Sequence, residues 1–182
     1  MEATALAVFF GNYYDLYWVL DEGRQKVLLA APPSAFDGDR GLWALVRAQT
    51  YDLRGEKALA RAYADTAQLE FADQLKGTPD DGQLDALRGL ALAYLGRKAD
   101  AIAEGRRGVA LIPVSRDAQS GPYIQHQLAR IYILLGEPEQ ALDQLEPLLR
   151  IPYHLSPGWL RIDPTFAPLK GNPRFEKLIA GS

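Results

Sequence analysis

Apolar and polar positions follow a helical period most clearly over residues 122–153. In the first half of this stretch, apolar or small residues recur three or four positions apart, at Leu128, Ala129, Tyr132 and Leu135. The second half repeats the spacing at Ala141, Leu142, Leu145 and Leu148. Gly136 stands between the halves, and glycine ends helices readily because it adopts the left-handed conformation without steric cost. The pattern predicts two amphipathic helices, joined by a short turn and packed antiparallel.

The same turn glycine recurs along the chain, at Gly55, Gly96 and Gly136, at intervals of 41 and 40 residues (55 to 96 and 96 to 136). Small residues lie seven positions before each glycine and five positions after it, at Ala48, Gly89, Ala129, Ala60, Ala101 and Ala141. Helices that cross at small residues can approach each other closely. Because one hairpin cannot bury its own apolar face, the repetition predicts an all-α stack of neighbouring hairpins.

These aligned positions resemble the tetratricopeptide repeat (TPR), whose period is about 34 residues. The resemblance implies a right-handed superhelix of about four hairpins, closed by a short helical C-terminal cap. The extra residues of each repeat are expected in the loop-like stretches Gly77–Gly82 and Ser115–Gly121. A first hairpin is expected near Ala3–Ala31 with its turn at Asp21–Gly23. It is degenerate, since Lys26 stands where alanine is expected.

We therefore predict a single TPR-like domain over residues 1–182. Its parts are the degenerate first hairpin, three repeats and the C-terminal cap, at residues 1–38, 39–77, 78–114, 120–153 and 154–182. Within the cap, three residues of capping type each precede a proline, at Ser156, Asp163 and Asn172. This order predicts three short helical turns.

Two further prolines mark expected helix boundaries. Thr78 and Pro79 have the same order of cap and proline, which predicts that a helix begins there. Pro147 lies inside the second predicted helix of the last repeat, where it removes a hydrogen bond. A kink or an early end is expected near Glu146.

A more particular resemblance covers residues 82–178. The segments Leu160–Pro164 and Pro168–Phe175 are similar to the ending of a repeat region in large bacterial signalling proteins. In those proteins the region follows a serine/threonine kinase, a cyclase-like domain or a winged-helix domain. This chain has no kinase glycine loop, no catalytic aspartate motif and no basic recognition helix. The resemblance therefore implies a non-catalytic regulatory or scaffold segment.

The N-terminal stretch Ala3–Leu20 is apolar enough to suggest a membrane segment or a signal peptide. It contains Gly11, Asn12 and Asp15, and Glu2 stands where a signal peptide carries basic residues. A buried amphipathic helix is expected instead. Because the chain enters this helix directly, we also expect a domain cut from a longer protein.

Charge and cysteine content exclude several classes of function. The twenty Lys and Arg residues are scattered among twenty-three acids, the net charge is −3, and no basic stripe suggests nucleic-acid binding. The absence of cysteine excludes disulfides and thiolate metal sites. A cytoplasmic location is expected, or a periplasmic one if the parent is membrane-anchored.

Few residues suggest chemistry, and the sequence predicts no catalytic residue, cofactor or metal. His126 and Arg130 share a helix face and could hold a carboxylate or form a solvated pair. His154 lies in a connector. Asp80, Asp81 and Asp85 suggest either a metal or the acids that favour a helix start.

Two other short segments have structural explanations. Ser115–Asp117 has no histidine close in sequence to activate a serine. Gly105–Gly108 is too short for a phosphate loop. Its glycines are expected to let helices approach, with Arg106 and Arg107 facing water.

By analogy with the family, the first helices of the hairpins line a concave groove that binds a protein or peptide. The residues assigned to it are Asp15, Trp18, Gln49, Asp52, Leu90, Tyr94, His126 and Arg130. Trp18 could instead pack inside the first hairpin. The alternative function is a small-molecule or lipid sensor with an apolar pocket around Trp18, Leu90 and Tyr94. Self-association is also possible for such a surface.

Overall fold

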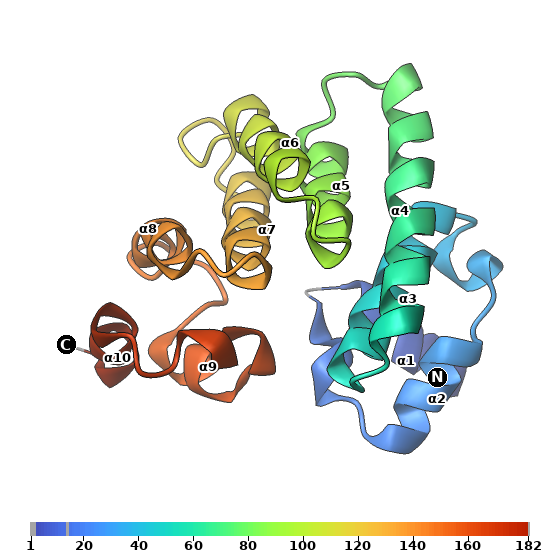
Figure 1. Cartoon of the computed structure of the whole chain (residues 1–182), viewed down its shortest axis with the longest axis horizontal. Coiled ribbons are helices and arrows are strands. Elements are labelled where there is room, and N and C mark those ends of the chain that lie inside the picture. Colours follow the sequence, from blue (N-terminus) through green and yellow to red (C-terminus); the bar gives the residue numbers. More distant parts are fainter. Residues whose placement is uncertain (1–2, 14, 182) are drawn as a thin grey trace. The chain divides into compact units, whose positions relative to one another are not determined.

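The computed structural model describes residues 3–13 and 15–181, and every regular element within these ranges is a helix (Figure 1). The predicted all-α class is therefore confirmed. None of the described helices combines the length and apolar character needed to cross a membrane. The chain forms two compact units, Met1–Lys76 and Gly77–Ser182, which are described separately.

The first unit contains six helical elements. They are α1 (Ala3–Asn12), η1 (Leu16–Val19), α2 (Glu22–Ala30), η2 (Pro33–Phe36), α3 (Arg40–Leu53) and α4 (Lys57–Gly77), where η denotes a 3-10 helix. Helices α3 and α4 form an antiparallel hairpin, since Arg40 at the start of α3 bonds Glu70 in the second half of α4 (2.9 Å). A buried cluster around Leu28 and Phe36 fills the space among the shorter elements.

The first hairpin differs from its prediction in two ways. The apolar stretch Ala3–Leu20 is not one helix, because α1 ends at Asn12 and the chain turns through Asp15 at a φ of 56°. Asparagine and aspartate favour such breaks, since their side chains tolerate the left-handed region. The predicted turn at Asp21–Gly23 is also wrong. Asp21 caps α2 by accepting a hydrogen bond from the Arg24 amide (2.8 Å), and Gly23 lies inside the helix.

Helix α4 is longer than the repeat pattern suggested. It continues for 21 residues to Gly77, so the extra residues of this repeat lengthen the helix and leave only a short loop before α5. The cause is local composition: from Lys57 to Lys76 the chain contains no glycine or proline and is rich in strong helix formers.

The second unit contains two further hairpins and the C-terminal cap. The hairpins are α5 (Gly82–Tyr94) with α6 (Lys98–Leu111), and α7 (Ser120–Leu134) with α8 (Pro138–Leu148). The cap consists of α9 (Pro157–Ile162), η3 (Pro164–Leu169) and α10 (Pro173–Ala180). Helix α7 packs against both α5 and α6, so the two hairpins are neighbours.

The turn glycines behave alike in all three hairpins. Gly55, Gly96 and Gly136 have φ values of 77°, 75° and 72°. After each glycine, the next amide donates to a carbonyl five residues back; Glu56, for example, donates to Tyr51 (2.9 Å). This bond satisfies a carbonyl at the helix end. The small residues that flank the turns are buried, as the pattern required: Ala48, Gly89, Ala129, Ala60, Ala101 and Ala141.

Helices α5 and α6 approach so closely that only glycine fits at several crossings. A Cβ atom added to Gly108 would lie 2.5 Å from the Gly82 carbonyl oxygen, and one added to Gly89 would lie 2.9 Å from the Ala101 carbonyl oxygen. A Cβ atom added to Gly105 would instead meet a side chain of α7, because it would lie 2.7 Å from Ile131 Cδ1. The prediction that Gly105–Gly108 permits close approach is confirmed.

Two prolines lie close to helix boundaries, at the start of α5 and at the end of α8. Helix α5 begins at Gly82 and not at Thr78, because Asp81 is the residue whose carboxylate accepts the free amides of Gln83 and Leu84 (both 3.0 Å). Thr78 instead begins a turn, in which its carbonyl accepts the Asp81 amide. Pro147 lies in the last turn of α8, which ends one residue later at Leu148.

The three proline-containing turns predicted for the cap are present. Ser156, Asp163 and Asn172 cap α9, η3 and α10, each accepting a backbone amide of the turn that follows. The apolar residues of the cap share one buried cluster with the last hairpin: Leu160, Phe166, Leu169 and Phe175 pack with Leu128, Leu142, Leu145 and Leu148. The cap thus covers the apolar side of α7 and α8.

Candidate functional site

The residues assigned to the concave groove are divided between the two units. Asp15, Trp18, Gln49 and Asp52 lie in the first unit, and Leu90, Tyr94, His126 and Arg130 lie in the second. Each group is described within its own unit, and a role in partner binding stays a prediction for all eight residues.

The members in the first unit occupy three kinds of position. Asp15 and Trp18 follow the end of α1 and are not on a first helix, and Trp18 packs, half-buried, against the Leu28 cluster. Gln49 is buried in α3. Asp52, at the end of α3, accepts a hydrogen bond from Lys57 Nζ (2.6 Å).

The members in the second unit are more deeply placed. Leu90 is fully buried, whereas Tyr94 is half-buried at the end of α5. His126 and Arg130 are only 3% and 2% exposed, so they are not a solvated surface pair. Arg130 donates to the Gln127 side chain (2.9 Å), one turn earlier on α7.

The His126 side chain is surrounded by aromatic rings, most of which belong to the connector and the cap. Its ring stacks on Phe166, with centroids 5.9 Å apart and planes inclined by 12°. The Tyr153 hydroxyl lies 3.3 Å from His126 Nδ1, and the His154 ring lies 5.7 Å away. Burial holds the pKa of His126 well below its ordinary value, and the charges of Arg130 and His154 lower that pKa further.

A charged cluster lies between α5 and α6. Asp85 is fully buried and accepts a hydrogen bond from Arg107 Nη1 (2.5 Å), while Glu104 accepts one from Arg88 Nη1 (2.5 Å). Burial raises the pKa of Asp85 to about 6; Arg107 opposes this rise and the neighbouring Glu104 carboxylate adds to it. Arg107 is exposed to water, as the sequence predicted, and in addition pairs with the buried acid.

The candidate metal site is not assembled. Asp81 caps α5, the Asp80 side chain is largely exposed, and Asp85 pairs with Arg107. Within the described ranges, no group of three or more His, Asp or Glu residues is placed to hold a metal ion. The capping explanation accounts for Asp81, whereas Asp85 belongs to the buried ionic cluster.

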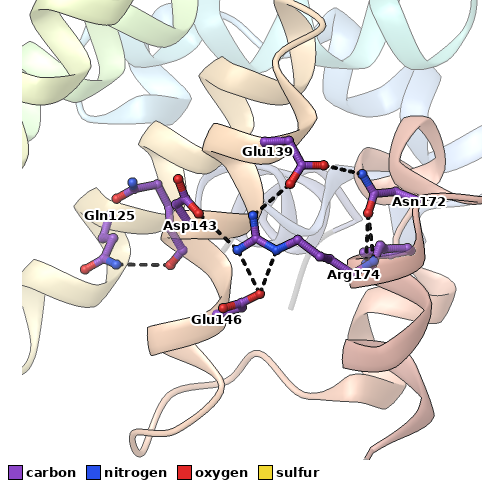
Figure 2. A network of polar contacts seen from close by, with 8 residues as sticks. Gln125, Glu139, Asp143, Glu146, Asn172 and Arg174 are labelled. Atoms are coloured by element: carbon purple, nitrogen blue, oxygen red, sulfur yellow. Dashed lines mark hydrogen bonds and ion pairs between the residues drawn. The ribbon is translucent and has the colours of Figure 1, made fainter.

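Arg174 joins the cap to α8 through three acids, and sequence reasoning missed this contact (Figure 2). Its Nη1 donates to Glu139 (2.8 Å), its Nη2 to Asp143 (3.0 Å) and its Nε to Glu146 (3.1 Å). Asn172, the α10 cap, also donates to Glu139 (2.7 Å). The three acids raise the pKa of Arg174, so it stays charged. Their spacing of four and three residues on α8 was the available signal.

A second missed cluster holds Arg47 between aromatic rings in the first unit. Its guanidinium carbon lies 4.5 Å from the Trp43 ring and 5.1 Å from the Tyr63 ring. Arg47 also donates to the Tyr63 hydroxyl (2.8 Å) and to the Ala31 carbonyl (3.2 Å). These contacts tie α3 to α4 and to the end of α2.

An open groove of about 370 Å³ runs along α1. Thr4, Val8, Phe9, Tyr13 and Ala35 line much of it. Phe9 and Tyr13 are about half exposed, and their rings lie 4.9 Å apart. This groove was not predictable from the apolar pattern of Ala3–Leu20, which indicates a helix buried on its apolar side.

Comparison with protein-family models gives no match, and neither do comparisons with curated proteins and with solved structures. The functional argument therefore depends on the residues and contacts of this chain.

Proposed function

We propose that the chain is a TPR-like protein–protein interaction module, acting as a regulatory or scaffold segment of a bacterial signalling protein. The observation that carries this proposal is the repeated hairpin. Helices α3–α4, α5–α6 and α7–α8 share a left-handed turn glycine and buried small residues at matching positions. Tandem hairpins of this kind present their helices as an extended surface on which a partner segment can lie.

The proposed partner is a protein or peptide segment that contacts the first helices α3, α5 and α7. Asp52 and Tyr94 are the partly exposed members of the predicted groove near the ends of α3 and α5. Within its own unit, the Asp52 carboxylate can pair with a basic side chain, and the Tyr94 hydroxyl can hydrogen-bond a polar group. Four other members of the predicted groove are buried and would support the surface by packing under it: Gln49, Leu90, His126 and Arg130.

Site-specific photocrosslinking tests the proposal. A photoreactive phenylalanine analogue is placed at Tyr94 or at Asp52, and the control carries it at Leu69, which is 58% exposed on α4. The proposal expects one protein partner to be captured from both groove positions and not from Leu69. Capture from Leu69 alone, or from no position, would contradict the proposed surface.

The alternative is a small-molecule or lipid sensor, and the groove along α1 favours it. Its rim carries the exposed rings of Phe9 and Tyr13, which suit an apolar ligand. A thermal-shift screen with metabolites and lipids separates the two functions. Stabilisation that is lost in Phe9→Ser, together with no crosslinked protein, would favour the sensor.

A further inference from the structure

The contact between α7 and the C-terminal cap contains a histidine whose environment suits only its neutral form. His126 is buried among the rings of Tyr153, His154 and Phe166. Its Nδ1 lies near the Tyr153 hydroxyl, and Nε2 has no hydrogen-bond partner among the described residues. A proton on this ring would therefore add a second N–H donor and a positive charge inside an aromatic contact.

The charged and titratable groups around His126 offer that charge little compensation. Arg130, one turn along α7, and His154 in the connector both disfavour a positive charge on the His126 ring and lower its pKa. Tyr153 contributes a neutral hydroxyl. On the cap side, the Asp163 carboxylate accepts hydrogen bonds from Trp159 Nε1 (3.1 Å) and from the Thr165 amide (2.8 Å).

We propose that the C-terminal cap is a proton-sensitive cover over the last hairpin, which opens when His126 takes up a proton. Opening separates Phe166 and Leu169 from the buried cluster that they share with α7 and α8. This device goes beyond the proposed interaction function and does not depend on it.

The direction of the effect follows from proton linkage. The pKa of His126 in the closed form lies well below the ordinary value of 6.5 that it regains when the cap opens. Above pH 6.5 the ring is neutral in both forms, and the closed form keeps its full advantage. Below pH 6.5 the open form binds the proton more readily. The opening equilibrium then shifts by up to about tenfold for each pH unit, until the closed form also titrates.

The Arg174 contact explains why opening would be local. Hydrogen bonds from Arg174 and Asn172 lower the pKa of Glu139, so this ion pair persists in mildly acidic solution. Acid therefore weakens the contact at His126 while α10 stays tied to α8. Asp85 has the opposite effect on stability. Because its pKa is raised in the folded chain, the folded α5–α6 pair becomes more stable as pH falls.

Amide hydrogen exchange on the full chain tests the proposal, with rates corrected for intrinsic exchange between about pH 7.5 and 5.5. The amides of Leu160, Phe166 and Leu169 should show an opening constant that rises by up to about tenfold per unit below pH 6.5. The opening constants of the amides in α5 and α6 should not rise with them. His126→Phe should abolish the rise, whereas the control His154→Gln should retain it.

Two results would overturn the proposal. One is a His126→Phe variant whose cap amides keep the pH dependence of the parent. The other is an acid-induced opening that is equal in the cap and in α5–α6, because it would show global unfolding. If His126→Phe does not fold, NMR of the unaltered chain decides the question. The His126 ring should stay neutral at pH 6, and a titration at 6.5 or above would contradict the mechanism.

Discussion

At the scale of single residues, the sequence predicted what local chemistry determines and missed what distant partners determine. Gly136 and Asn172 act through neighbours within a few residues, so their roles as helix end and helix cap were predictable. His126 and Asp85 depend on residues tens of positions away, namely Phe166 and Arg107. Helical spacing identified their faces but could not show that those faces are buried.

Gly108→Ala should destabilise the second unit. The added methyl would lie 2.5 Å from the Gly82 carbonyl oxygen, which is backbone and cannot rotate away. Overpacking of this kind costs about 1–3 kcal/mol. Gly77→Ala is the matched control, because a methyl added at Gly77 would meet no neighbouring atom within 4 Å. Chemical denaturation of both variants measures the difference. If the two variants have equal free energies of unfolding, α5 and α6 do not approach each other as closely as the 2.5 Å distance requires.

Asp85→Asn should change how stability depends on pH. Because the folded pKa of Asp85 is about 6, against an ordinary value of 3.8, the parent chain gains stability as pH falls from about 7 to 4. The gain is at most about 3 kcal/mol, and the variant should lose it. Asp80→Asn, which alters a largely exposed carboxylate, is the control. Denaturation curves at several pH values provide the comparison, and an unchanged slope in Asp85→Asn would contradict the assignment.

At the scale of elements, the residues at which the cap helices begin were predicted more reliably than the lengths of the helices. Proline after a capping residue correctly placed α9, η3 and α10. The continuous helix expected over Ala3–Leu20 breaks after Asn12, and the extra residues of the second predicted repeat lengthen α4 up to Gly77 instead of the loop. Both errors have one cause. A broad pattern, which was apolarity over Ala3–Leu20 and the family period at α4, was given more weight than the local residues, namely Asn12 and Asp15 or an uninterrupted run of helix formers.

Arg174→Ala should loosen α10 from α8. The variant loses the hydrogen bonds to Glu139, Asp143 and Glu146 and leaves three acids facing one another on α8. Faster hydrogen exchange in α10 and a lower melting temperature are expected, and added salt should reduce the difference. Lys177→Ala removes an exposed positive charge from the same helix and serves as the control. Equal effects of the two variants would show that total charge, and not this contact, holds α10.

At the scale of the whole molecule, the central claim is that one hairpin is used repeatedly. The turn glycines and buried small residues support it in α3–α4, α5–α6 and α7–α8. The single domain predicted over residues 1–182 and its right-handed superhelix stay predictions. Sequence patterns constrain each hairpin, but the rotation between neighbours depends on side-chain packing across their interface.

Truncation after Pro152 should cause self-association. Removing the cap exposes the apolar cluster around Leu142, Leu145 and Leu148. Loss of Phe166 and Phe175, both fully buried, should cost about 2–3 kcal/mol each. Light scattering and thermal melting compare the truncated and full chains. A truncated chain that stays monomeric and melts with the parent would show that the cap is dispensable.

The most direct test of the repeated hairpin is a crystal structure of the full chain, in which α3–α4, α5–α6 and α7–α8 are superposed in turn. The account predicts that the three hairpins superpose closely, with the turn glycines and the small residues that flank them at equivalent positions. Hairpins that do not superpose, or small residues that lie at different positions in each hairpin, would contradict it.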